Sequence, residues 1–599
     1  MEDGPLHGAY PLDDAMFIRF PSRRSVVHGT NGMVSTSSPL ATEAGLQVLR
    51  DGGNAADAAI AAAAVLNLVD PSMTGVGGDA FCLFYRAETR KVHALNGSGR
   101  SPANASLDDI CAKLGIIDRN SGSIPSTSIH SVTVPGAAAA WLDIIGKYGS
   151  GQVTVSQVLA PAIRMAKEGA PISEISSYNW HNSEKDLRQA VTEEGLLKWD
   201  PDCTGKYRAP RAGEIIANIP LARTFKLLAE RGKSGFYEGP VAEAIVEASQ
   251  RHGGYLTLDD LKNHKSEEVN PIAIQLDLPS AKTPVNLWEH PPNGQGIVAQ
   301  MALGILAELE REGKIPQFTL EDHNSSKYLH AVIQALRIAF ADGSWHITDP
   351  TCAVDPEDLI SQSYLAQRAK LFDPVRSTDI AEPGDLGGLH KTSDTVYLCV
   401  TDPEGNACSL VNSVSDSFGS RIIPSGTGFV LQNRGSGFHL GPEHHPNIYA
   451  PGKRPYTTII PAMVTNASDR TLHTAFGVMG GAMQPQGHVQ VLMNMLRFGM
   501  DPQMALDAPR ICIGVSLPGK STDPSKTIDR TVYIEEGIDA TVVRELAEMG
   551  HEVKIVTGTG RSLFGRGQII HVHQDQASGQ RIYSAGSDMR GDGNAAPLL

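Results

Sequence analysis

A short stretch near residue 395 constrains this 599-residue chain strongly, because it places a threonine at the first position of a strand. Val396 begins a run of strand-forming residues, which a turn-forming segment, 402–406, and a second apolar run, 407–414, follow. A Thr hydroxyl is a weak nucleophile unless a base lies beside it, and a chain that begins with Thr supplies that base as its own α-amine. Such an amine has an unperturbed pKa of about 7.7–8.0. The hairpin therefore predicts a nucleophile if the chain is cut before Thr395, and otherwise only a strand that starts with Thr.

Composition limits the class of protein and of partner. The chain is 41% hydrophobic and 20% charged, which is ordinary for a globular protein, and its formal net charge of −15 argues against nucleic acid or an anionic membrane as the partner. The acidic N-terminus is followed by no apolar run typical of a signal peptide. We therefore expect a cytoplasmic protein without a membrane anchor.

Neither the cysteines nor the histidines indicate a metal site. None of the seven cysteines forms a Cys-x-x-Cys pair, so neither a disulfide framework nor a zinc site is predicted. The histidine pairs 444–445 and 571/573 lack a carboxylate that would complete a ligand set. We expect no metal and no cofactor.

Helical and strand patterns alternate along the rest of the chain. Residues 1–27 are polar and predict a flexible arm, and the stretch 343–390, rich in Asp, Pro and Gly, predicts an exposed linker before the cleavage point. Asn54 is expected to cap a buried, Ala-rich helix that reaches Leu68. The other helices are predicted at 39–50, 137–147, 155–168, 240–253, 296–311, 328–341, 485–498 and 539–549, and further strands at 80–85, 92–96, 471–478 and 553–556.

Several motifs recur in the order known from one enzyme family. They are 52–58 (GGNAADA), 74–79 (TGVGGD), 394–395 (DT), 402–407, 418–420 (FGS), 426–433 (GTGFVLQN), 452–458 (GKRPYTT) and 479–481 (MGG). Together they resemble the γ-glutamyltransferase family of self-cleaving N-terminal-nucleophile hydrolases. The resemblance implies a layered α/β fold, a four-layer αββα sandwich, made as one precursor. Cleavage between Asp394 and Thr395 would leave a large subunit, 28–394, and a small subunit, 395–599, that form one folded unit.

The resemblance also assigns catalytic roles. It implies that Thr395 is the nucleophile and, through its freed amine, the base, and that Ser413 hydrogen-bonds this amine. Gly480 and Gly481 would hold the oxyanion, and the strand–glycine–helix pattern around them independently predicts backbone N–H groups aimed at one spot. Thr457 and Thr458 fall where the family has paired Ser residues that contact the substrate carboxylate.

The chain departs from typical γ-glutamyl enzymes at both ends of the clamp for the α-amino acid. The family's carboxylate-binding Arg is expected at Ser98, but the nearest Arg here is Arg100. The family's paired acids, one of which holds the α-ammonium, are replaced by Ser436 and Gly437. Losing such a charge-assisted bond costs roughly 1.5–3 kcal/mol. An anion without an amino group, held by Arg100 and Arg434, is therefore the expected substrate.

Three functions remain open. The segments 96–100 (NGSGR) and 432–436 (QNRGS) resemble a branch of the family that includes oxamate amidohydrolase. This resemblance implies attack on a small carboxylate-bearing amide, with water or an amine as the acceptor of the acyl group. One alternative is γ-glutamyl transfer or hydrolysis in glutathione metabolism, and the other is a scaffold without turnover. Either Arg could instead be solvated or paired within the protein, and association of processed units into a homo-oligomer is compatible with the sequence.

Overall fold

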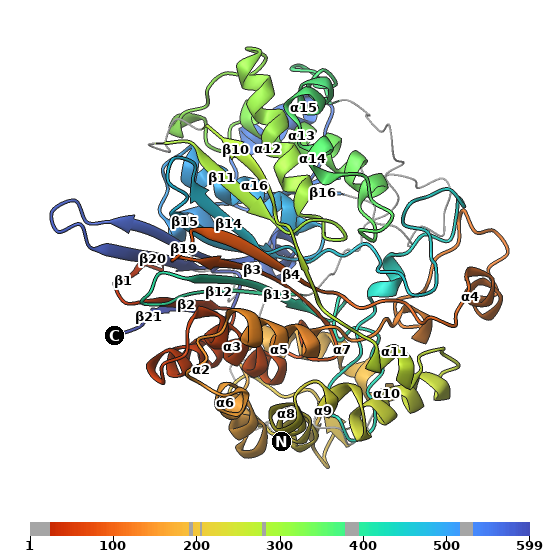
Figure 1. Ribbon diagram of the computed structural model, residues 1–599. Helices are drawn as coiled ribbons and strands as arrows, with labels where there is room; N and C mark the ends of the chain where they lie inside the picture. Colours follow the sequence, from red (N-terminus) through yellow and green to blue (C-terminus); the bar gives the residue numbers. More distant parts are fainter. Residues whose placement is uncertain (1–23, 191–195, 204–205, 278–282, 378–394, 515–530) are drawn as a thin grey trace, which may run out of the picture.

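The computed structural model describes residues 24–190, 196–203, 206–277, 283–377, 395–514 and 531–599. Two seven-stranded antiparallel sheets lie face to face, and helices cover the outer face of each (Figure 1). The predicted four-layer αββα order is confirmed. Asp394, on one side of the predicted cleavage point, lies outside the described residues.

The first sheet, called sheet I, contains the hairpin that begins at Thr395. Its strand order is β21-β2-β12-β13-β3-β4-β9. Val396 of β12 pairs with Asn412 of β13, so Thr395 lies beside Ser413 where this ladder ends. The strands are β2 (Met33–Thr36), β3 (Asp79–Arg86), β4 (Lys91–Gly97), β9 (Glu267–Val269), β12 (Val396–Thr401), β13 (Ala407–Ser413) and β21 (Asn594–Pro597).

The second sheet, called sheet II, carries the glycine pair. Its order is β1-β20-β19-β15-β14-β11-β10, and the central strand β15 ends immediately before Gly480. β12 packs on β15 and β19 between the layers. Tyr397, near the start of β12, lies against Gly477, near the end of β15. The strands are β1 (Val27–Gly29), β10 (Ile272–Leu276), β11 (Val285–Glu289), β14 (Ala462–Asn466), β15 (Leu472–Met479), β19 (Arg566–Gln574) and β20 (Arg581–Ser587).

The outer helices follow the predicted pattern closely. Every residue of α3 is buried, and Asn54 and Asp57 form a reciprocal capping box at its start. On the side of sheet I lie α2 (Pro39–Arg50), α3 (Ala55–Val69), α5 (Ala137–Tyr148), α6 (Val155–Glu168), α7 (Glu174–Ala190), α8 (Ile219–Arg231), α9 (Ser234–Tyr237), α10 (Pro240–Arg251) and α11 (Leu258–Lys262). The short helix α4 (Leu107–Leu114) lies apart from this layer, at the right edge of Figure 1. No helix among the described residues combines the length and the apolar character that crossing a membrane requires.

Sheet II is covered by a second helical layer. It contains α12 (Gly296–Arg311), α13 (Ser326–His346), α14 (Pro356–Leu359), α15 (Gln362–Ala369), α16 (Met483–Leu496), α17 (Pro502–Asp507) and α18 (Ala540–Glu548). The smaller elements are β5 (Ala170–Pro171), β6 (Lys198–Trp199), β7 (Tyr207–Arg208), β8 (Ile215–Ile216), β16 (Ile511–Ile513), β17 (Thr531–Glu535), β18 (Glu552–Val556) and the 3-10 turns η1 (Ile129–Ser131), η2 (Leu320–Asp322), η3 (Arg434–Gly437) and η4 (Gly558–Phe564).

Two predicted irregular segments are partly ordered. The stretch 343–390 is not a linker throughout, because α13 continues to His346 and α15 packs on α12 with Leu365 buried. The sequence of this stretch is mostly polar, and the apolar face of α15 is too short to give a clear helical pattern. The described end of the predicted arm is also attached, since Arg24 Nη1 donates to the carbonyl of Gly593 at 2.6 Å. Residues 1–23 lie outside the described part.

Candidate active site

A continuous chain of hydrogen bonds starts at the Thr395 hydroxyl. Thr395 Oγ1 donates to Ser413 Oγ at 3.2 Å. Arg434 bridges the next two groups, with Nη2 donating to Ser413 Oγ at 3.2 Å and Nη1 donating to Thr458 Oγ1 at 2.7 Å. The amide of Ser415 also donates to Ser413 Oγ, at 2.9 Å. The structure thus joins four residues predicted for the site.

Burial holds this chain in place. Thr395 and Ser413 are 0% exposed, and Arg434 and Thr458 are only 3% and 5% exposed. The predicted glycine-rich segment before β3 makes the close packing possible, because a Cβ on Gly78 would stand 2.1 Å from the Ser413 carbonyl oxygen. The glycine here allows backbone approach beside the nucleophile and serves no phosphate.

Asp79 supplies the carboxylate nearest to Arg434. Its Oδ1 accepts the Gly99 N–H at 2.8 Å, while its Oδ2 lies 3.7 Å from Arg434 Nε. Neither Oδ2 nor Nε has a hydrogen-bond partner among the described residues. Burial raises the pKa of Asp79 to about 6, against the opposing charge of Arg434. Arg434 is therefore a buried cation whose nearest carboxylate does not use up its donors.

The glycine pair forms a turn that only glycine adopts readily. Gly480 has φ +124° and Gly481 has φ +56°. Their carbonyls accept the first N–H groups of α16, from Met483 at 2.9 Å and Gln484 at 3.1 Å. No backbone or side-chain acceptor among the described residues takes the N–H of either glycine. Two free donors at this turn suit an oxyanion.

The turn between β11 and α12 contributes two residues that the sequence did not single out. Gln295 Nε2 donates to the carbonyls of Thr458 and Gly481, each at 2.7 Å. Asn293 Nδ2 donates to Thr457 Oγ1 at 3.0 Å, and the Asn293 carbonyl accepts the Thr457 N–H. The only sequence signal for either residue was its place in the Pro-Pro-Asn-Gly-Gln-Gly turn.

Arg100 belongs to a different set of contacts. Its guanidinium donates to Glu267 at 2.9 Å, to Asp349 at 3.1 Å and to the carbonyl of Gly452 at 3.2 Å. Arg454 donates to the same Glu267 at 2.7 Å. Among the described residues, the hydrogen bonds and ion pairs of the Arg100 side chain all lie in this network and none reaches the chain from Thr395, which favours the alternative that Arg100 is paired within the protein.

The positions that depart from the typical γ-glutamyl pattern are used by the fold. Ser98 is 0% exposed and its Oγ donates to Asn96 Oδ1 at 2.8 Å, so its hydroxyl is used within the protein. Ser436 Oγ donates to the Asn433 carbonyl at 2.9 Å. A Cβ on Gly437 would lie 3.1 Å from the Tyr456 carbonyl oxygen. The ammonium side of the clamp is therefore replaced by closely packed neutral groups.

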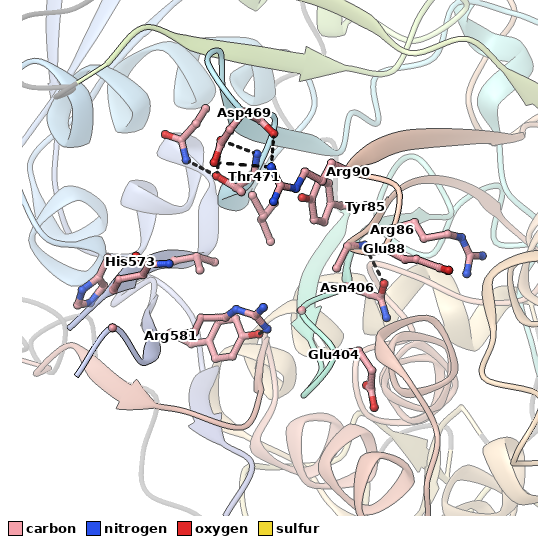
Figure 2. A pocket seen from close by; sticks show the side chains of 18 of the residues that line it. Tyr85, Arg86, Glu88, Arg90, Glu404, Asn406, Asp469, Thr471, His573 and Arg581 are labelled. Atoms are coloured by element: carbon pink, nitrogen blue, oxygen red, sulfur yellow. Dashed lines mark hydrogen bonds and ion pairs between the residues drawn. The ribbon is translucent and has the colours of Figure 1, made fainter. Parts of the chain in front are cut away.

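A large cavity lies at the opposite end of the β12–β13 hairpin. It has a volume of about 1000 Å³ and is lined by hairpin turns of both sheets, with Arg90, Asp469, Glu404 and Arg581 around it (Figure 2). Six strand residues, roughly 20 Å, separate this end of β12 from Thr395. The cavity is thus not part of the Thr395 site.

The histidines that were considered as metal ligands do not form a metal site in the described part of the chain. His571 and His573 stack on β19, and His445 stacks on His439. Among the described residues, no group of three or more His, Cys, Asp or Glu side chains is arranged to hold a metal ion.

Comparison with known proteins decides the family. Residues 41–598 match the family described as Gamma-glutamyltranspeptidase. The chain belongs to the γ-glutamyltranspeptidase family. A glutathione hydrolase-like YwrD proenzyme of Bacillus subtilis is 34% identical over 96% of this chain and 100% of its own length. An oxamate amidohydrolase proenzyme of Klebsiella pneumoniae is 30% identical over 90% of this chain and 94% of its own.

A solved structure agrees over the whole chain. A cephalosporin acylase from Bacillus halodurans superposes with a TM-score of 0.81 at 37% identity, covering 100% of this chain and 99% of that one. This γ-glutamyltranspeptidase-family chain is thus a self-processing proenzyme of an amidohydrolase, cut into a large and a small subunit.

The contacts of Arg100 generate a prediction. We expect Arg100→Ala to lower the free energy of unfolding by about 1 kcal/mol, because Arg100 and Glu267 are partly exposed and the buried Asp349 keeps its bonds from the Arg454 amide and Thr351. The KM for an anionic amide should stay near the wild-type value. Thermal unfolding and steady-state kinetics on the same preparation measure both. A several-fold higher KM at unchanged stability would instead show that Arg100 binds substrate.

Proposed function

We propose that the precursor cuts itself between Asp394 and Thr395 and that the freed Thr395 hydrolyses a small amide whose acyl group carries a carboxylate and no α-ammonium. The observation that carries the proposal is the position of Arg434. Its guanidinium contacts both Ser413, the partner of the nucleophile, and Thr458. An acyl carboxylate bound by this guanidinium would lie close to Thr395.

The mechanism uses groups of the chain alone. The free α-amine of Thr395 takes the proton from Oγ1 as this oxygen attacks the amide carbon. The N–H groups of Gly480 and Gly481 stabilise the tetrahedral oxyanion. When the C–N bond breaks, the amine returns the proton to the leaving nitrogen and an ester on Oγ1 remains. Water, activated by the same amine, then hydrolyses the ester and releases the acid.

Anion recognition is supported by the charge around the site. Arg434 is buried, always protonated, and able to present a planar pair of donors to a carboxylate. A γ-glutamyl group would bring an α-ammonium to the neutral surface of Ser436 and Gly437. The lost charge-assisted bond, roughly 1.5–3 kcal/mol, corresponds to about a tenfold to hundredfold weaker interaction.

Glutathione hydrolysis is the second candidate, because a relative of nearly full coverage is described as glutathione hydrolase-like. The chemistry of Thr395 would be the same for both substrates. Only recognition of the ammonium separates the two, so substrates that differ in this group alone decide between them.

The proposed function predicts self-cleavage of the precursor. Purified wild type should separate on a denaturing gel into two fragments, the smaller of which begins Thr-Val-Tyr-Leu by N-terminal sequencing. Thr395→Ala should remain one inactive chain, because it removes the hydroxyl that attacks the preceding peptide bond. Wild type that is intact and yet active would contradict the role of the freed amine.

The second prediction uses a matched pair of substrates. Glutaryl and γ-glutamyl p-nitroanilide differ only in the α-amino group, and we expect kcat/KM for the glutaryl compound to be at least about tenfold higher. Release of p-nitroaniline measures both. Equal or faster turnover of the γ-glutamyl compound would favour glutathione as the substrate.

Arg434→Lys is the matching variant for the binding residue. It keeps the charge but removes the planar pair of donors, so KM for the glutaryl anilide should rise by about tenfold. Processing into two subunits should be compared in parallel. An unchanged KM would remove Arg434 from the binding site.

A further inference from the structure

The side chain of Gln295 connects two loops that face the acyl group. It is 0% exposed and lies one residue before α12. One loop contains Tyr456 and Thr458, and the other contains the glycine pair. Nothing in the self-cleavage chemistry or in substrate charge requires a glutamine here, so its contacts call for a separate explanation.

All the polar atoms of the Gln295 amide are used. Nε2 donates to the Thr458 carbonyl and to the Gly481 carbonyl, both at 2.7 Å. Oε1 accepts the Tyr456 hydroxyl at 2.7 Å. A buried amide bonded in this way has one orientation, because rotating it would turn its oxygen toward two carbonyl oxygens, which are also acceptors.

These bonds restrain the glycine turn on both sides of Gly481. The bond from Met483 N–H to the Gly480 carbonyl fixes the peptide plane that carries the Gly481 N–H. The Gly481 carbonyl, on the following peptide plane, accepts from Gln295 Nε2 and from the Gln484 N–H, so the planes on both sides of Gly481 are held. Both glycines have positive φ and lack a side chain that could pack, so these bonds replace the restraint that packing gives elsewhere.

After the proposed cleavage, the residues of this contact belong to different subunits. Gln295 precedes residue 395, whereas Tyr456, Thr458 and Gly481 follow it. After the proposed cut, the oxyanion turn and the loop of Thr458 belong to the small subunit and their shared buried amide to the large one.

We infer that Gln295 is a positioning residue, which holds the oxyanion turn at Gly481 in register with Thr458 across the two subunits. The inference rests on the proposed function, since it assumes an oxyanion at Gly480 and Gly481. Gln295 itself touches the loops and not the reacting atoms. Its loss should therefore reduce kcat more than it raises KM.

A second buried glutamine, in α12, offers a matched control for Gln295. Gln300 is also 0% exposed, and its Nε2 donates to the carbonyls of Ile272 and Leu287 at 2.9 and 3.0 Å. These carbonyls belong to β10 and β11. Gln300 therefore shares with Gln295 its residue type, its burial and a pair of Nε2 bonds to carbonyls, but none of the partners of Gln295 in the site. Its Oε1 has no hydrogen-bond partner among the described residues, whereas Gln295 Oε1 accepts the Tyr456 hydroxyl.

The experiment compares Gln295→Met with Gln300→Met. Both variants should be cut into two subunits, and their Tm should fall by similar amounts. Only Gln295→Met should have a lower kcat, by on the order of 10²-fold, as expected when the oxyanion donors are misplaced. Rates are measured on whichever of the two anilides the wild type hydrolyses faster. A wrong acyl preference would then contradict only the proposed function, whereas equal kcat of the two variants would overturn the role of Gln295.

Tyr456→Phe keeps the proposal testable if Gln295→Met does not fold or process. It removes only the hydroxyl that Gln295 Oε1 accepts and leaves both donors of Nε2 in place. We expect kcat to fall several-fold with a smaller change in KM. Wild-type kcat in processed Tyr456→Phe would overturn the inference.

Discussion

The pairing of β12 with β13 is the constraint on which the site depends. Because the ladder runs from Thr401↔Ala407 to Val396↔Asn412, Thr395 and Ser413 end side by side. The hydrogen-bond chain from Thr395 to Thr458 passes through Ser413 Oγ, which accepts from the Thr395 hydroxyl, the Ser415 amide and Arg434. A slip of one residue in this register would turn Thr395 to the opposite face of sheet I.

Two layers supply the two halves of the chemistry. Sheet I positions Thr395, the proposed nucleophile, and β15 of sheet II ends at the glycine turn, whose N–H groups have no acceptor in the part of the chain that the structure describes. Apolar packing between β12 and the strands β15 and β19 holds the two layers together. Buried polar bonds connect the groups of the site, because Arg434 joins Ser413 to Thr458 and Gln295 joins Thr458 to Gly481. A buried polar group that loses its hydrogen-bond partner destabilises the protein, so a site built from such a network tolerates few conservative substitutions.

Much of the fold was predictable, because local chemistry determines it. The capping box at Asn54, the apolar run of α3 and the hairpin at Thr395 each depend on residues a few positions apart. The resemblance to a family then ordered the layers. The glycine pair was predictable for the same reason, since a strand that ends in Gly-Gly before a helix leaves amides exposed.

The remaining features depend on partners far apart in sequence. Arg100 and Arg434 were equivalent candidates, and only the fold brings Glu267 and Asp349 to one and Ser413 to the other. Gln295 carried no pattern at all, because its importance comes from carbonyls more than 160 positions later. The helix α15 was hidden in a polar stretch since its apolar face is only a few residues long.

The covalent step tests the central claim most directly. Processed protein mixed with glutaryl p-nitroanilide and quenched in acid during turnover should yield a small subunit heavier by one glutaryl group, and peptide mapping by mass spectrometry should place the group on Thr395. An unmodified small subunit during turnover, or an acyl group on any other residue, would contradict nucleophilic attack by the freed threonine.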